Sequence, residues 1–216
     1  MESANIIHIE PKLNEGIYST KDISDILDLP YSKVRQSMGG FWQDYTFGAH
    51  RDKAINFLTL IEFYTYYKLR EIGIKPYVIK KAHTEIAKHL NTPYPFARNI
   101  IHTDGKGIWY NLLELLINAD GTQQINIAQI IEPFLNKIQF NEKNLAEKFF
   151  PLAGSNRIVV DPKYQFGQPV IAGTRIKAEI INDFYKAGES ITLICKLYKL
   201  SKEQVEDAIT YYKQIA

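Results

Sequence analysis

Residues 30–38, which read PYSKVRQSM, combine side chains that can contact a nucleic acid. The exposed face predicted for this segment has a hydroxyl, two cations and an amide but no carboxylate. Groups of these kinds bind phosphate oxygens, or base edges in the major groove. Two further cations follow His50 in the next loop. The candidate DNA-binding residues are therefore Ser32, Lys33, Arg35, Gln36, Arg51 and Lys53. The alternative is that a short basic helix is only a solvated surface.

The last predicted helix of the chain has the opposite balance of charge. Its exposed charged residues are Lys202, Glu203, Glu206, Asp207 and Lys213, three acids against two bases. Such a surface repels phosphate, whose attraction to cations provides most non-specific DNA affinity. We therefore expect DNA contact in the N-terminal part, and self-association or contact with a protein partner in the C-terminal part.

Residues that could support catalysis are scattered. The histidines show no metal-ligand spacing with cysteines or carboxylates; they are His8, His50, His83, His89 and His102. The sequence has no phosphate-binding glycine loop and no nucleophile elbow. We therefore expect no metal, no cofactor and no enzymatic activity, with a nucleic-acid enzyme as the least favoured class.

Composition places the chain among globular proteins. It has 216 residues, 45% hydrophobic content and a formal net charge of +2. There is no apolar run of membrane-spanning length and no signal-peptide pattern. The single cysteine, Cys195, excludes an internal disulfide and is predicted to be a buried small hydrophobe. These features indicate a cytoplasmic protein.

The N-terminal residues form the pattern of two short helices. Ser19 and Asp22 make a capping-box pair before the first helix, and residues 28–30 make a tight turn. The second helix, 30–38, is predicted to bury Tyr31, Val34 and Met38. Two short helices joined by three residues indicate a helix-turn-helix.

The segments that follow predict a wing, two helices and a mixed middle region. Residues 41–53 fit a small β wing, and helices are expected over 54–71 and 76–90. In the middle, Asp104-Gly105 and Asp120-Gly121 are turn signals between apolar runs, which indicates hairpin-like strands. A helix over 127–135, interrupted at Pro133, completes this region.

Residues 167–176 read GQPVIAGTRI, which predicts a strand between two turns. Periodic apolar residues then predict a helix that ends at Gly188, a second helix capped by Ser190, and a third that starts with a Ser201–Gln204 capping box. A hairpin followed by three helices has the outline of a winged helix. The residues assigned to the structural turn are Gly167, Pro169, Gly173, Thr174 and Arg175. The alternative for residues 173–175 is contact with a ligand, and Arg175 could equally donate to neighbouring carbonyls.

The run 167–176, together with Asp161-Pro162, Phe166 and the Ala187–Ser190 turn, resembles a module found at the C-terminus of many prokaryotic antitoxins. The resemblance covers residues 157–212. It implies a role in a type II toxin–antitoxin pair, similar to that of VapB-like antitoxins.

Residues 18–90 resemble the DNA-binding domain of MerR-type regulators in the order of their elements and in the Leu69–Gly73 stretch. The arginine-tyrosine-tyrosine signature of that family is reduced here to Arg35-Gln36-Ser37, so metal or drug sensing is not carried over.

Together, these features predict a mainly α fold with small β elements. The expected divisions are an N-terminal lead-in (1–16), a MerR-like winged helix-turn-helix domain (17–92), a mixed connecting region (93–155) and a C-terminal module (156–216). The two resemblances imply an antitoxin that neutralises a PIN-like ribonuclease toxin and represses its own operator DNA, with no membrane contact. We expect a homodimer, because two recognition helices on a two-fold axis can read a palindrome. The alternative is a stand-alone MerR-like regulator with a ligand-sensing middle region.

Overall fold

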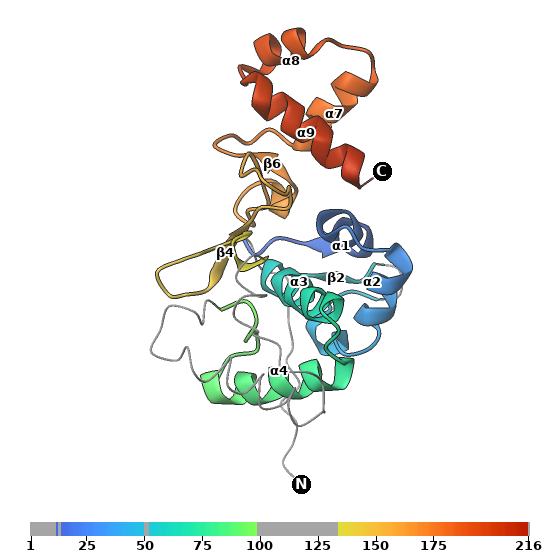
Figure 1. Ribbon diagram of the computed structural model, residues 1–216, viewed down its shortest axis with the longest axis vertical. Helices are drawn as coiled ribbons and strands as arrows, with labels where there is room; N and C mark the ends of the chain where they lie inside the picture. The colour runs from blue at the N-terminus through green and yellow to red at the C-terminus, as the bar shows by residue number, and fades with distance from the viewer. Residues whose placement is uncertain (1–11, 13, 50–51, 99–133, 216) are drawn as a thin grey trace. The chain divides into compact units, whose positions relative to one another are not determined.

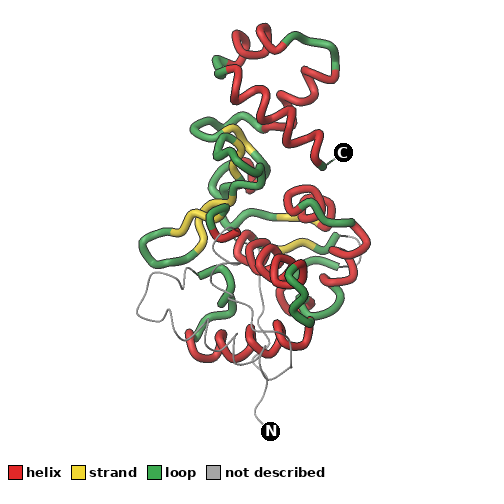
Figure 2. Tube along the Cα trace, viewed as in Figure 1, coloured by secondary structure: helices red, strands yellow, loops and turns green. Residues whose placement is uncertain are grey.

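The computed structural model describes residues 12, 14–49, 52–98 and 134–215 (Figure 1). Helix dominates these residues, and the strands are short stretches that pair two by two (Figure 2). This confirms the predicted mainly α fold with small β elements. No helix in the described ranges is long and apolar enough to cross a bilayer.

The chain forms two compact units. The middle unit comprises Met1–Ile9 and Leu58–Glu147, and the joined unit comprises Glu10–Phe57 and Lys148–Ala216. The joined unit therefore takes its residues from two segments that are far apart in the sequence.

The N-terminal half of the joined unit is built around two short helices. Strand β1 (Tyr18–Ser19) pairs antiparallel with β2 (Ala54–Ile55) and leads directly into α1 (Thr20–Leu27). The predicted capping box is present, because the Ser19 side chain accepts from the N–H of Asp22 and the Asp22 carboxylate accepts from the N–H of Ser19. Three residues connect α1 to α2 (Tyr31–Met38). Within this connection the N–H of Leu29 donates to the carbonyl of Ser24 at 2.9 Å.

The segment predicted as a β wing is mostly irregular. It contains a 3-10 helix, η1 (Gln43–Tyr45), beside the buried Trp42. Phe47 then exchanges two backbone hydrogen bonds with Ala54, at 3.0 and 2.9 Å. Within the described residues of 41–53, the wing is thus reduced to the pairing of Phe47 with Ala54, at the start of β2.

The C-terminal half of the joined unit is a hairpin followed by three helices, as the sequence predicts. Strand β5 (Ile158–Val159) pairs antiparallel with β6 (Val170–Ile171), and η2 (Gln165–Gly167) lies between them in the chain. The helices are α7 (Ala178–Lys186), α8 (Ile191–Tyr198) and α9 (Lys202–Gln214). Ser190 caps α8, and Ser201 forms a capping box with Gln204 at the start of α9, as expected.

These helices and the hairpin enclose one apolar core. Its buried members include Ile158, Ile171, Ile181, Ile194, Val205 and Ile209. Cys195 is half-buried and packs against this cluster, so its surroundings are those of a small apolar side chain. One apolar residue of α7, Ile180, lies outside this core and is 38% exposed. Ile180 precedes the buried Ile181, and consecutive helical residues point about 100° apart, so Ile180 lies toward the edge of the face that Ile181 buries.

Tyr18 holds the two halves of the joined unit together. Its side chain is fully buried, and a Cβ atom added at Gly167 would lie 2.0 Å from its hydroxyl oxygen. Burial raises the pKa of the Tyr18 phenol well above its usual value, and Asp161 and Asp22 add to the shift. Gln168 strengthens the junction, because its side-chain N–H donates to Asp22 at 3.0 Å. Asp22, the third residue of α1 and the second member of its capping box, is thereby tied to the C-terminal module.

The middle unit contains α3 (Phe57–Glu71), α4 (Pro76–Leu90) and the two strands β3 (Ile138–Phe140) and β4 (Ala146–Phe149). Helix α4 has the predicted bounds, whereas α3 begins later than predicted because residues 54–55 form β2. The turns predicted at Asp104-Gly105 and Asp120-Gly121 lie outside the described residues, as does most of the helix predicted over 127–135.

A buried carboxylate organises the middle unit. One oxygen of Glu62 accepts from the backbone N–H groups of Phe96 and Ala97, at 2.8 and 2.9 Å. The other lies 3.0 Å from Nε2 of the buried His83 on α4. Burial raises the pKa of Glu62, while His83 and the two N–H groups oppose that shift. Glu62 thus links α3, α4 and the segment that follows α4.

The packing of Tyr18 against Gly167 predicts that alanine substitutions at two glycines lower the stability of the chain by different amounts. Gly167 and Gly173 both have positive φ, +86° and +80°, but an added Cβ at Gly173 meets nothing within 4 Å. We expect Gly173→Ala to destabilise the chain by about 1–2 kcal/mol through backbone strain alone. Gly167→Ala should cost about 1–3 kcal/mol more, because its methyl group collides with Tyr18. Urea unfolding of both variants measures the difference, and equal stabilities would mean that Tyr18 does not need this glycine.

The contacts of the Glu62 carboxylate predict that two substitutions at this position lower the stability of the chain to different extents. Glu62→Ala leaves two buried N–H groups and His83 without their acceptor, so we expect a loss of about 3–5 kcal/mol. Glu62→Gln keeps a carbonyl oxygen for the backbone and should lose less. Thermal unfolding tests the order, and an alanine variant as stable as the unsubstituted chain would contradict it.

Candidate functional site

Helix α2 presents a cationic polar face to solvent. Val34 and Met38 are buried, and α2 contains no acid. The residues predicted from the sequence to contact DNA on this helix are all exposed; they are Ser32, Lys33, Arg35 and Gln36. The structure therefore brings these four side chains to one surface of the joined unit.

Tyr31 departs from the sequence prediction. It was placed on the buried face, but 48% of it is exposed. Tyr31 is the first residue of α2, and helical side chains lean toward the helix N-terminus, so this ring extends beyond the packed turn. Its position directly after Pro30 was the signal that could have indicated this. Tyr31 adds a phenol to the four polar residues of α2.

Of the remaining two candidates for DNA contact, the structure describes only Lys53, and Lys53 does not join this group. Lys53 is half-buried, and its ammonium donates to the carbonyl of Met38 at 3.4 Å. A cation at this position stabilises the negative end of the α2 dipole and satisfies one of its terminal carbonyls. Arg51 lies outside the described residues.

The turn at residues 169–176 is held by its own hydrogen bonds. The Thr174 hydroxyl donates to the carbonyl of Ile171 at 2.8 Å and accepts from the N–H of Ile176 at 3.1 Å. The carbonyl of Pro169 accepts from the N–H of Ala178, at the start of α7, at 3.0 Å. Thr174 and Pro169 thus connect β6 to α7.

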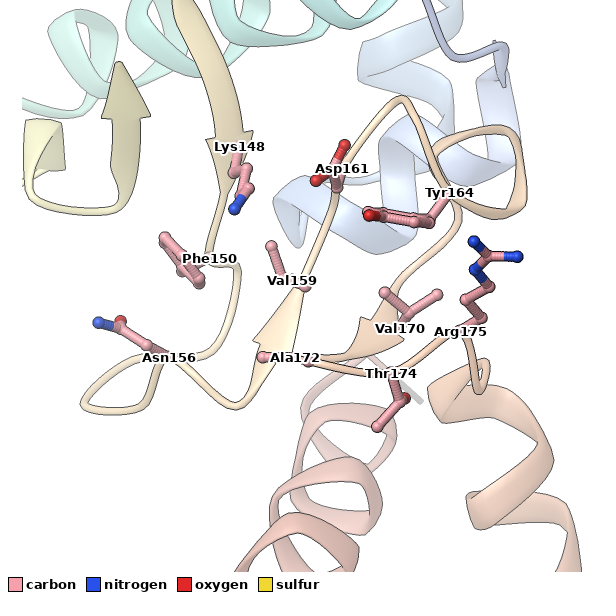
Figure 3. A pocket seen from close by; sticks show the side chains of 11 residues that line it. Lys148, Phe150, Asn156, Val159, Asp161, Tyr164, Val170, Ala172, Thr174 and Arg175 are labelled. Carbon is pink, nitrogen blue, oxygen red and sulfur yellow. The ribbon is translucent and has the colours of Figure 1, made fainter. Parts of the chain in front are cut away.

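Arg175 differs from its neighbours, because its side chain is exposed. Its guanidinium lies over the ring of Tyr164, 5.7 Å from the ring centroid, which is a cation–π geometry. Figure 3 shows it pointing toward Tyr164, whereas Thr174 points away. Only the backbone of Arg175 helps to hold the turn, since its carbonyl accepts from the Gln165 side chain at 3.0 Å.

A hollow of about 470 Å³ lies beside Arg175 (Figure 3). Its polar lining includes Lys148, Asn156, Tyr164 and Arg175, together with Asp161, which is only 2% exposed. Asp161 accepts from the N–H of Lys163 at 2.9 Å, so this carboxylate also supports the loop that carries Tyr164.

Helix α9 keeps a partly neutralised acidic surface. Asp207 pairs with Arg157 at 3.1 Å and accepts from the hydroxyl of Ser155, and Glu206 lies 3.4 Å from Lys202. Within the described ranges, no three His, Cys, Asp or Glu side chains converge as a metal site would require.

Three comparisons with known proteins bear on this arrangement. Residues 158–212, which span β5 to α9, match the family described as "Protein of unknown function (DUF433)". The fold as a whole is similar to the crystal structure of Rv2018 from Mycobacterium tuberculosis, with a TM-score of 0.73 and 21% identity. That match covers 94% of this chain and 99% of the other, and it shows a shared fold.

A relative from Mycobacterium tuberculosis is named "Putative antitoxin VapB45". The two sequences are 24% identical over 168 residues, which is 71% of this chain and 69% of the relative. The resemblance therefore extends well beyond the C-terminal module and is consistent with an antitoxin-like protein.

Proposed function

We propose that this chain is the antitoxin of a type II toxin–antitoxin pair. The observation that carries the proposal is the similarity, over 71% of the chain, to the relative named "Putative antitoxin VapB45". An antitoxin of this kind acts by binding a toxin and its operator DNA, so the surface for each of these partners must be exposed to solvent. The exposed faces of α2 and of the Arg175 region meet that condition.

The first of the two binding roles is operator contact through α1 and α2. In this proposal α1, the connecting turn and α2 act as a helix-turn-helix, with α2 in the major groove. Lys33 and Arg35 provide phosphate or guanine contacts, and Ser32 and Gln36 provide hydrogen bonds to backbone or base edges. A homodimer places two such helices on a palindromic operator, and binding there represses the pair.

The second role is neutralisation of a PIN-like ribonuclease toxin by the C-terminal module. The acidic surface of α9 is unsuited to DNA, whereas the module has exposed apolar and cationic groups near Arg175. The alternative function is a stand-alone regulator that senses a ligand through the middle of the chain. Ligand-dependent operator binding without a protein partner would favour that alternative.

The DNA role predicts a specific loss in the double variant Lys33→Ala, Arg35→Ala. Operator affinity should fall, and the slope of log affinity against log salt should flatten by roughly one unit per lost phosphate contact. The matched control is Lys186→Ala with Lys196→Ala, two exposed cations on α7 and α8. Gel-shift titration at several salt concentrations measures both. If the control weakens binding as much as the α2 variant, the DNA contact does not lie on α2.

The antitoxin role predicts a growth phenotype. The product of the neighbouring gene should slow growth when expressed alone, and co-expression of this chain should restore it. The Lys33→Ala, Arg35→Ala variant should still protect, because neutralisation is assigned to another surface. Gly173→Val should protect less, because a β-branched residue is strained at a φ of +80°. A harmless neighbour would refute the antitoxin assignment, and loss of protection in the α2 variant would refute the division of roles.

A further inference from the structure

A second hollow, of about 620 Å³, lies in the joined unit and shares Tyr164 and Arg175 with the first. Its charged lining residues are all cationic: Lys12, Lys163 and Arg175. Three apolar or aromatic side chains complete the feature, namely Ile17, Tyr164 and Phe166. We call these six residues the Phe166 surface. A lining with cations and no carboxylate attracts an acidic partner.

The Phe166 ring is exposed to solvent, and the backbone that carries it is strained. It is 71% exposed, and both Gln165 and Phe166 have positive φ, at 49° and 55°. Two consecutive non-glycine residues in this region are uncommon, and such strain persists only where the surroundings hold it. Burial of the ring within its own chain does not account for the strained backbone, since the ring is exposed.

Four hydrogen bonds hold this loop in place. Within the loop, the N–H of Gly167 donates to the carbonyl of Tyr164 at 2.8 Å, and that of Gln168 donates to Gln165 at 3.0 Å. From outside, the N–H of Ile17 donates to the carbonyl of Phe166 at 3.0 Å, and the Gln165 side chain donates to the carbonyl of Arg175 at 3.0 Å. The backbone that carries the ring is therefore held in place before any partner arrives, which lowers the entropy lost on binding.

The composition of the surface favours a protein over a single-stranded nucleic acid. Single-stranded nucleic acids stack successive bases on several open aromatic faces, but Arg175 already lies over the Tyr164 ring, which leaves Phe166 as the open ring of this surface. Ile17, which is 41% exposed, is hydrogen-bonded to Phe166 through the backbone and adds an aliphatic contact. A surface that combines aromatic and aliphatic side chains with cations has the composition of a protein interface, where aromatic residues and arginine provide the strongest contacts.

We propose that the Phe166 surface is the site where the toxin docks, an inference that rests on the proposed antitoxin function. The Phe166 ring enters an apolar pocket of the toxin, and Arg175 and Lys163 pair with carboxylates around that pocket. The surface is distinct in sequence and in chemistry from the polar face of α2, so one chain can engage toxin and DNA through separate residues.

The test is titration calorimetry of the purified full chain against the purified product of the neighbouring gene. We expect Phe166→Ala to weaken binding by about thirtyfold, the effect of losing a strong aromatic contact. Arg175→Glu should weaken it by about tenfold or more and reduce its salt dependence. The matched controls are Leu197→Ala, 58% exposed on α8, and Lys196→Glu, also exposed on α8; both should bind like the unsubstituted chain. Thermal unfolding confirms that all variants are folded.

The outcomes separate this inference from the function on which it rests. If the unsubstituted chain does not bind the neighbouring product, the antitoxin function fails and the docking site fails with it. If it binds, and Phe166→Ala and Arg175→Glu bind equally well, the docking site is wrong while the function stands. Fluorescence anisotropy with a single-stranded RNA oligonucleotide adds a third outcome. Tight RNA binding that Phe166→Ala abolishes would reassign the surface to nucleic acid and overturn the proposal.

Discussion

The close packing of Tyr18 against Gly167 is the constraint on which the joined unit depends. The phenol is fully buried, and only a residue without a side chain can occupy position 167 at that distance. Tyr18 immediately precedes the cap of α1, and Gly167 immediately follows Phe166. One contact therefore fixes both the start of the polar helix pair and the loop that displays the exposed ring. The Gln168–Asp22 hydrogen bond reinforces the same junction.

Local sequence signals predicted much of this architecture. Polar caps such as Ser19 and Ser201 act on backbone groups three residues away, so their effect can be inferred from spacing alone. The exposure of Arg35 and burial of Val34 followed from helical periodicity for the same reason. Long-range partners could not be inferred in this way. The spacing of residues does not indicate that Tyr18 packs against Gly167. Nor does it indicate the hydrogen bonds from Lys53 to the Met38 carbonyl and from the Phe96 N–H to Glu62.

The chemistry of the joined unit separates into two surfaces of different character. The α2 face is polar and cationic and carries the donors that suit phosphate and base edges. The Phe166 surface places cations around apolar groups, which suits an acidic protein with an apolar pocket. Tyr31 shows how the end of a helix changes its exposed face. As the first residue of α2 it is partly exposed, and its phenol adds to the polar face of that helix. A single compact unit thus presents both surfaces, with the Tyr18 junction between their supporting segments.

The joining of residues 10–57 to 148–216 also determines when this unit can form during translation. Chains emerge from the ribosome N-terminus first, so residues 10–57 are exposed to the cytosol while the middle segment is still being synthesised. Tyr18 cannot pack against Gly167 until residue 167 has left the exit tunnel. Bringing Tyr18 and Gly167 together closes a long loop of chain, and this has an entropic cost. That cost must be overcome before the contacts between them stabilise the folded unit. The polar helix pair therefore reaches its final packing only after the strained loop has been made, and a prematurely terminated chain would have neither surface complete.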